Sequence, residues 1–157
     1  MQCIDTHVHL QNKAYADDLE AVLTRAADAG VRACIVPGSD LASSRAAVAL
    51  AERYAAGACA LYAAVGVHPT NGHTLTPEVL AELETLAQHP RVVAVGEIGL
   101  DYYWPRRTDR SWRCATRDEQ QTALEQQLQL AAEHDLPVIL HDRDAHDAML
   151  ETLEHWR

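Results

Sequence analysis

Two histidines near the amino terminus, His7 and His9, are the first residues whose spacing could do chemistry. Side chains alternate between the two faces of a β-strand, so a strand through these positions would place both imidazoles on one face and Val8 on the other. Two imidazoles arranged in this way can bind one metal ion. The alternative is a pair of surface or hydrogen-bonded histidines, because histidine serves many polar roles.

Polar side chains that could do chemistry also follow each later apolar stretch of the chain. They are Asp40, His68, Glu97 with Asp101, and His141 with Asp142 and Asp144. In parallel α/β folds the carboxyl ends of the strands converge on one face, so residues scattered in sequence would meet there. Together, His7, His9, Glu97 and His141 predict a site for a divalent metal ion such as zinc or manganese.

Glu97 is the central candidate in this set, both as a metal ligand and as the catalytic residue. A carboxylate can bridge two ions, and two ions about 3.5–4 Å apart are a common means of hydrolysing phosphate esters. Taken alone, Glu97 could equally be a strand-end carboxylate that accepts hydrogen bonds from backbone amides. Three histidines at other strand ends favour the metal-site interpretation.

The apolar pattern predicts the elements that would position these residues. Strands are expected over residues 2–5, 33–37, 60–66, 91–96 and 137–140. Helices are expected over residues 17–29, 41–56, 77–88, from 116 onward and over 144–155, with Asp17–Glu20 and Thr116–Glu119 as capping pairs. Such a repeat indicates a parallel sheet covered by helices, either an open doubly wound sheet or a (β/α)8 barrel. No Gly-x-Gly-x-x-Gly follows the first strand, which disfavours a dinucleotide-binding fold.

The charge distribution limits how the protein could meet nucleic acid. The 157 residues carry a formal net charge of -10, which argues against a surface that coats nucleic acid broadly. Five arginines nevertheless lie within residues 106–117, near Trp104 and Trp112: Arg106, Arg107, Arg110, Arg113 and Arg117. Such a cluster can bind a phosphodiester locally, the alternative being a solvated loop.

Composition and the amino terminus indicate a soluble, cytoplasmic protein without a membrane partner. Hydrophobic residues make up 48% of the chain and charged residues 23%, as in globular proteins. The apolar runs are shorter than the ~18 residues of a membrane span, and the first residues lack the pattern of a signal peptide. The four cysteines form no Cys-x-x-Cys pair, so we expect reduced and mostly buried thiols.

Four segments, in this order and spacing, resemble the TatD family of metal-dependent hydrolases. They are Ile4-Asp5-Thr6-His7-Val8-His9-Leu10, Val65-Gly66-Val67-His68-Pro69, Gly96-Glu97-Ile98-Gly99-Leu100-Asp101-Tyr102-Tyr103 and Pro137-Val138-Ile139-Leu140-His141-Asp142-Arg143-Asp144-Ala145. The resemblance covers essentially the whole chain. It implies a TIM barrel, two divalent metal ions (Mg, Mn or Zn) and deoxyribonuclease activity, often as a 3′–5′ exonuclease on single-stranded DNA or 3′ ends.

The resemblance also implies a role for each residue at the site. The implied metal ligands are His7 and His9 for the first ion, His141 for the second and Glu97 for both. His68 would lie near the substrate phosphate, the alternative being a histidine that holds a tight turn. Arg143 would contact the substrate and Asp101 would orient a ligand, although either could be a structural ion-pair residue.

The length of the chain departs from the pattern of the family. A complete barrel has eight strand–helix units, typically ~250 residues, and this sequence stops after the fifth. We therefore expect residues 1–157 to form one domain of the α/β class, an incomplete TIM barrel truncated at its carboxyl end. The resemblance also implies a histidine after the sixth strand and an aspartate after the eighth, and this sequence does not contain those strands.

Three functional interpretations stay open at this point. The first is a TatD-like deoxyribonuclease whose 157 residues alone bind metal weakly and hydrolyse little DNA, unless a second chain or self-association completes the barrel. The second uses the same metal site to remove D-amino acids from tRNA or to cleave a small amide or ester. The third is a non-catalytic remnant or subunit, whose open strand edges would favour association.

Overall fold

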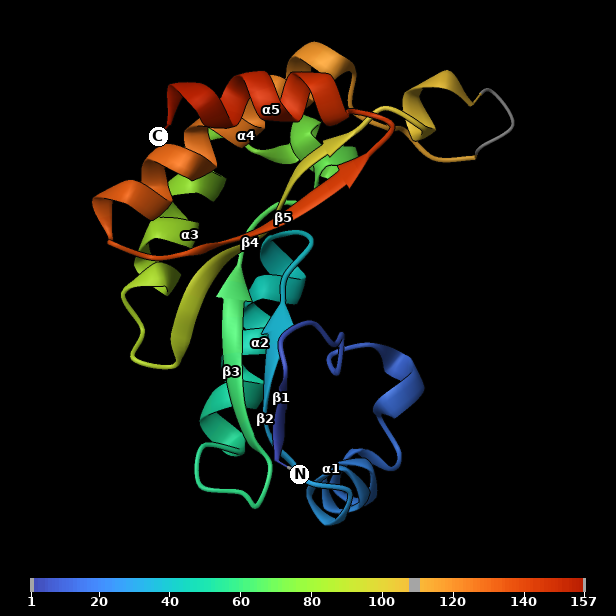
Figure 1. The fold of residues 1–157 in the computed structure, drawn as a ribbon, viewed down its shortest axis with the longest axis vertical. Helices are drawn as coiled ribbons and strands as arrows, with labels where there is room; N and C mark the ends of the chain where they lie inside the picture. Colours follow the sequence, from blue (N-terminus) through green and yellow to red (C-terminus); the bar gives the residue numbers. More distant parts are fainter. Residues whose placement is uncertain (1, 108–110, 157) are drawn as a thin grey trace.

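Five parallel strands form one curled sheet. The computed structural model describes residues 2–107 and 111–156. The strands are β1 (Cys3–Asp5), β2 (Val31–Pro37), β3 (Ala60–Val65), β4 (Val92–Asp101) and β5 (Val138–Arg143). Each strand lies beside its neighbour in sequence, in the order β1-β2-β3-β4-β5, and the sheet curls into a half-barrel (Figure 1). The predicted fold, an incomplete barrel of five β/α units, is confirmed.

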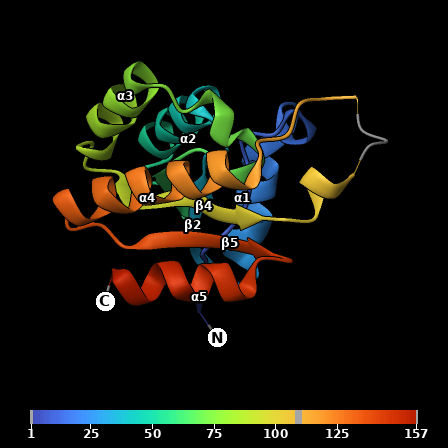
Figure 2. The same cartoon turned by 90° about the horizontal axis from the view of Figure 1, so that it is seen from above.

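A helix follows each strand along the chain, and the helices pack against the sheet. They are α1 (Leu19–Asp28), α2 (Leu41–Arg53), α3 (Pro77–Ala87), α4 (Arg117–Glu133) and α5 (His146–His155), with short 3-10 helices η1 (Lys13–Tyr15), η2 (Pro69–Thr74) and η3 (Trp104–Arg106). Figure 2 shows α2, α3 and α4 on one side of β4, with α5 beyond β5. Within the described ranges, no helix is both long enough and apolar enough to traverse a bilayer.

Side-chain caps begin the helices that follow three of the strands, with Thr76 as the cap of α3. Before α4, Thr116 and Glu119 form the predicted capping box, each side chain accepting a hydrogen bond from the other's backbone amide. Before α2, the Asp40 carboxylate accepts the Ser43 amide hydrogen at 2.7 Å. Asp40 therefore starts a helix, which accounts for a polar residue after β2.

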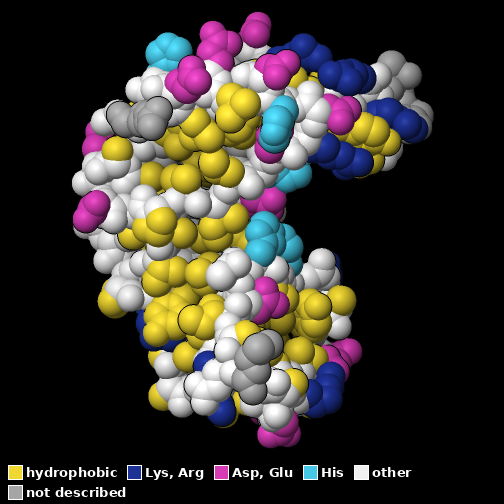
Figure 3. All heavy atoms as spheres, viewed as in Figure 1, with side chains coloured by type: hydrophobic (Ala, Val, Ile, Leu, Met, Phe, Trp, Pro, Cys, Tyr) yellow, Lys and Arg dark blue, Asp and Glu magenta, His cyan; other side chains and the backbone are white. Residues whose placement is uncertain are grey.

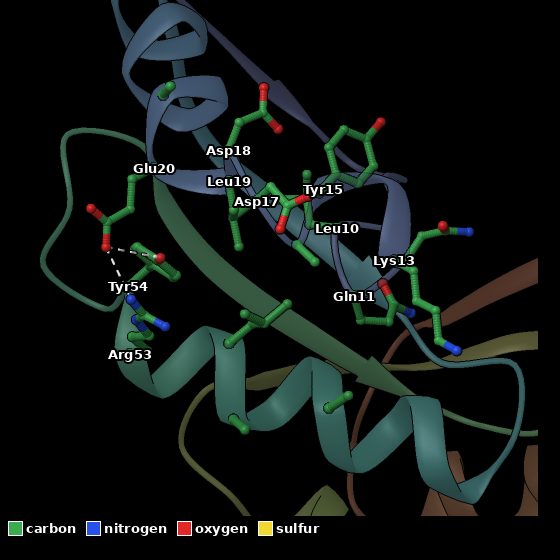
Figure 4. Close-up of a pocket in the computed structure, with 16 residues that line it drawn as sticks. Leu10, Gln11, Lys13, Tyr15, Asp17, Asp18, Leu19, Glu20, Arg53 and Tyr54 are labelled. Atoms are coloured by element: carbon green, nitrogen blue, oxygen red, sulfur yellow. Dashed lines mark hydrogen bonds and ion pairs between the residues drawn. The ribbon is translucent and has the colours of Figure 1, made fainter.

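The predicted capping pair Asp17–Glu20 is wrong. Helix α1 follows Asp18, whose side chain makes no capping hydrogen bond. The Glu20 carboxylate instead lies 3.0 Å from the Arg53 guanidinium and accepts the Tyr54 hydroxyl at 3.4 Å (Figure 4). These partners draw the Glu20 side chain across a groove of about 840 Å³ toward α2, away from the start of its own helix.

The core lies between the sheet and the helices. Large side chains that are fully buried there include Leu61, Leu83, Ile98, Leu100 and Leu124. Cys34, Cys59 and Cys114 are buried and Cys3 is exposed, so the prediction of mostly buried cysteines is confirmed. At the two edges of the sheet, Ile4 of β1 is 61% exposed and Leu140 of β5 is 38% exposed.

Strands β4 and β5 are longer than the apolar pattern predicts. We expected β4 to end near residue 96 and β5 near 140, but they remain paired as far as Asp101 and Arg143. Backbone hydrogen bonds to the neighbouring strand continue past residues that have polar side chains. A hydrophobic pattern does not identify such residues as part of a strand. The extension carries Glu97 and His141 inside strands and places Asp101 and Arg143 opposite each other.

Candidate metal centre

His7 and His9 converge in the turn that follows β1. The strand ends at Asp5, so the prediction that they share a face of a strand is wrong. The Asp5 carboxylate accepts the His7 amide hydrogen at 3.0 Å, and the Val8 amide donates to the Ile35 carbonyl at 3.1 Å. This turn brings the two imidazole Nε2 atoms to 3.2 Å from each other.

Glu97 lies between two groups of histidines. The register of β4 against β5 shifts between Gly96 and Ile98, so Glu97 occupies a bulge, a distortion that can redirect a side chain. Its Oε2 atom lies 3.3 Å from His7 Nε2 and 3.8 Å from His9 Nε2. Its Oε1 atom lies 3.0 Å from His141 Nδ1. With 12% of its side chain exposed, Glu97 offers one oxygen to each group.

His141 is in contact with three other polar side chains. Its Nδ1 atom faces Glu97 and lies 3.2 Å from His68 Nε2. Its Nε2 atom lies 3.0 Å from Oδ2 of Asp101, which is 1% exposed. The other nitrogen of His68 is 2.8 Å from the Thr70 hydroxyl. Asp101 thus holds the far side of the His141 ring, which leaves Nδ1 directed at Glu97 and His68.

Two overlapping groups of donor atoms have the composition of a divalent-cation site. The atoms of His7, His9 and Glu97 all lie within 4.8 Å of one another, as do those of His68, Glu97 and His141. Imidazole nitrogen and carboxylate oxygen suit zinc and similar divalent ions. Glu97 belongs to both groups, which is the arrangement expected of a bridging carboxylate. His68 was expected near the substrate, and the structure places it within the second group.

The local charges favour an ionised carboxylate among the histidines. Burial alone would raise the pKa of Glu97, but the hydrogen bond with His141 and the nearby His68 and His7 outweigh it, so the pKa lies below its usual value. The hydrogen bond to Glu97 raises the pKa of His141 despite partial burial, with Asp101 adding to the effect. Burial, and then repulsion by His141, lower the pKa of His68 to about 4. His68 is therefore neutral near pH 7.

Two glutamines of α4 hold the backbone beside this centre, and our sequence analysis missed both. Gln127 accepts the Val67 amide hydrogen at 2.7 Å and donates to the Val67 carbonyl at 3.1 Å, directly before His68. Gln120 makes the same pair of bonds with Asp101, at 2.7 and 2.9 Å. They are seven residues apart, on the apolar face with Leu124, and two amides on such a face could have indicated this role.

The arginine-rich stretch lies next to the centre. Arg143 stacks on the Tyr103 ring, with its guanidinium carbon 3.9 Å from the ring centroid. Arg106 lies 3.4 Å from Asp144, Arg113 pairs with Glu119, and Arg117 stacks on Tyr102. Arg110 lies outside the described residues. The described members of the predicted cluster therefore lie between the carboxyl ends of β4 and β5 and the start of α4.

A polar cavity of about 670 Å³ opens beside the histidines. Its walls include His9, His68 and Glu97, together with Lys13 and Asn71. Figure 3 shows histidines on the inner wall of a deep hollow in the molecule. A ligand in this cavity would therefore meet both the donor atoms and a positively charged side chain.

A half-barrel whose strand ends carry histidines and a shared carboxylate defines an α/β-barrel protein with a candidate divalent-cation site. The chain belongs to the TatD family, because the family model described as "TatD related DNase" matches residues 4–157. The crystal structure of YJJV, a TatD homologue from Escherichia coli K12, superposes with a TM-score of 0.82 at 40% identity, covering 97% of this chain and 55% of that one. The predicted membership is confirmed.

Curated relatives match over nearly the whole of this chain. A protein of Klebsiella pneumoniae named "3'-5' ssDNA/RNA exonuclease TatD" is 38% identical over 152 residues, which are 97% of this chain and 53% of that protein. A Bacillus subtilis protein named "Uncharacterized metal-dependent hydrolase YabD" is 37% identical over 96% of this chain and 54% of its own length. This chain thus spans about half the length of the relatives it matches.

Proposed function

We propose that this chain supplies the two-ion metal centre of a hydrolase that cleaves phosphodiester bonds in single-stranded DNA from the 3′ end. One observation carries the proposal: the two oxygens of Glu97 face different groups of histidines, His7 with His9 and His141 with His68. A carboxylate placed in this way can bind two divalent ions side by side, which suits phosphoester hydrolysis. The name of the Klebsiella relative supports a nucleic-acid strand as substrate.

The proposed roles follow from the contacts of each side chain. His7 and His9 would bind the first ion through Nε2, and His141 would bind the second through Nδ1, with Glu97 shared. Asp101 would keep the His141 ring in place, since carboxylates commonly orient metal-bound histidines. When bound, magnesium, manganese or zinc would supply a Lewis acid that activates water and stabilises charge on the phosphate.

Two further residues of this chain would bind and position the strand. Neutral His68 lines the cavity and can donate a hydrogen bond to a phosphate oxygen or offer its nitrogen to the second ion. Arg143, opposite Asp101 in the sheet, would provide positive charge for the phosphates on the other side of the centre. The name of the Klebsiella relative favours this substrate over aminoacyl-tRNA or a small amide.

Calorimetry with Mn2+ tests the metal centre directly. We expect the chain to bind Mn2+ and Glu97→Gln to lose both ions together, with a fall in affinity beyond the roughly 10–100-fold typical of an orienting residue. The matched control is Glu151→Gln, an exposed change in α5 that should leave binding unaltered. Absence of Mn2+ binding by the unaltered chain would contradict the proposal.

Hydrolysis is tested with the chain in excess over a 5′-labelled single strand. The incomplete barrel leads us to expect slow reaction from these residues alone, so single-turnover conditions over hours are appropriate. Products should shorten stepwise from the 3′ end, require Mn2+, and disappear with Glu97→Gln. Hydrolysis that continues unchanged in Glu97→Gln would exclude this centre as the source of activity.

A further inference from the structure

An aromatic cluster projects from the end of β4 beside the metal centre. We name residues 102–107 and 111–116 the arm. Within it, the Tyr103 and Trp104 ring centroids are 5.0 Å apart, and those of Trp104 and Trp112 are 5.7 Å apart, in edge-to-face arrangements. Trp112 is 42% exposed, and Tyr103 and Trp104 are only partly buried. Part of the ring surface therefore faces solvent, where it can accept another flat group.

A single carboxylate joins this cluster to the metal centre. Oδ1 of Asp101 accepts the backbone amide hydrogens of Tyr103 and Trp104, each at 3.1 Å. Oδ2 of the same carboxylate holds His141. The first residues of the arm are thus positioned by the group that positions a candidate metal ligand. A molecule lying on the rings would have a defined relation to the centre.

The charge around the rings indicates what kind of molecule fits. The chain carries a formal net charge of -10, yet the described part of the arm holds Arg106, Arg107 and Arg113. The Arg143 guanidinium also lies over Tyr103 and, at 5.6 Å, near Trp104. Figure 3 shows Lys and Arg side chains gathered with hydrophobic ones on the arm, which overhangs the hollow. Flat rings among positive charges suit a partner that is both planar and anionic.

We propose that Tyr103, Trp104 and Arg143 form a stacking site for a nucleobase of a single-stranded nucleic acid. The inference rests on the proposed function, because it assigns the neighbouring base to the arm while the phosphodiester lies at the metal centre. Stacking uses the face of a base, and every base has one, so the site tolerates any sequence. An isolated phosphate would gain nothing from the rings, and an apolar peptide would gain nothing from the arginines.

Binding to a strand without bases separates stacking from charge attraction. A 5′-fluorescein oligothymidylate of twelve nucleotides and an abasic strand of the same length are titrated with the full chain in EDTA, with fluorescence anisotropy as the readout. We expect the thymidylate to bind about tenfold more tightly. Trp104→Ala should remove this difference while leaving the abasic strand unaffected, and Trp104→Phe should restore most of it. An oligouridylate should respond to Trp104→Ala in the same way, since the sugar is not read.

Control variants exclude a structural explanation. Trp156→Ala removes a 37% exposed tryptophan at the end of α5 and should not alter binding. Arg143→Lys keeps the charge but loses the planar guanidinium, so it should weaken only the strand that has bases. Equal affinity of the unaltered chain for both strands would overturn the proposal, as would equal weakening of both by Trp104→Ala. Because EDTA removes divalent ions, this result is independent of Mn2+ binding and hydrolysis, which test the proposed function.

Discussion

Asp101 and His141 face each other across neighbouring strands, with Oδ2 of the carboxylate 3.0 Å from Nε2 of the imidazole. Asp101 is buried, and both its backbone N–H and its backbone C=O are hydrogen-bonded to the Gln120 side chain. The His141 ring is therefore held by a group that itself has little freedom to move. Its remaining nitrogen is directed toward Glu97, so the orientation needed for metal binding exists before any ligand arrives.

Replacing Asp101 by asparagine should weaken metal binding without removing a proposed ligand. The amide lacks the negative charge that helps raise the pKa of His141, so this pKa should fall. We expect Mn2+ affinity to fall roughly 10–100-fold, measured by calorimetry. Asp28→Asn, an exposed change at the end of α1, is the control. Unaltered affinity in Asp101→Asn would show that His141 needs no orienting partner.

The buried environment of His68 should make the metal-free chain less stable in mild acid. Its folded-state pKa is about 4, below the ordinary value of 6.5, so between these values the unfolded chain binds a proton that the folded chain does not. The free energy of unfolding should therefore fall as the pH drops from 6.5 toward 4. The His68→Gln variant should lose less stability than the unaltered chain over this pH range. Urea denaturation in EDTA measures the free energy of unfolding of both chains as a function of pH. The same dependence on pH in both chains would contradict the lowered pKa of His68. His141 has a raised pKa, so it stabilises the fold below 6.5 and loses this effect as the pH rises through its folded-state pKa.

Removing the Gln127 side-chain amide should destabilise the fold. Gln127→Ala leaves the buried amide and carbonyl of Val67 without their partner, and we expect a loss of about 2–5 kcal/mol in the free energy of unfolding. Gln126→Ala is a matched control, since the neighbouring side chain is exposed on the same helix and should change stability by less than about 0.5 kcal/mol. Urea denaturation decides between them. Similar losses in both variants would mean that the hydrogen bonds between Gln127 and Val67 do not set the effect.

Gly99 should not tolerate even alanine. Its φ is +140°, and a Cβ atom there would lie 2.0 Å from the His141 carbonyl oxygen. Gly99→Ala must therefore displace β5 near His141, and we expect more than about 2 kcal/mol of destabilisation together with weaker Mn2+ binding. At Gly57 the nearest atom would be 3.3 Å away, so Gly57→Ala should be far milder. Thermal melts followed by metal titration test both variants.

The exposed edges of the sheet should promote self-association. Ile4 and Leu140 expose apolar surface on β1 and β5, each of which pairs with one strand among the described residues. We expect the average mass in sedimentation velocity to rise with concentration. Ile4→Lys and Leu140→Lys together should reduce this rise, because charge on an edge opposes pairing. A monomeric mass at all concentrations would show that the edge strands do not drive self-association.

Much of this architecture follows from local patterns in the sequence. Alternating apolar runs and helical faces predicted all five strands and the order of the helices, because burial against a parallel sheet imposes both patterns. Parallel topology then predicted that His68, Glu97 and His141 would meet, although they are separated by as many as 73 positions. Capping at Thr116 was equally local and equally predictable.

Features that depend on contacts between segments distant in the sequence were not predictable. The bulge at Glu97 exists only in the register of β4 against β5, and the meeting of His7 with His9 depends on a turn held by Asp5 and β2. The local sequence predicted that Glu20 would be a capping residue, but its carboxylate instead pairs with Arg53 of another helix. In each case a contact that is distant in sequence outweighed the local preference.

The backbone hydrogen bonds made by Gln120 and Gln127 affect how the folded molecule opens locally. Through four hydrogen bonds a single helix, α4, secures the chain before His68 and the end of β4. Local opening that exposes either segment must break hydrogen bonds to α4, so both should exchange their amide hydrogens as one cooperative unit. A cation that binds the folded centre would slow this exchange, since it stabilises only the closed form.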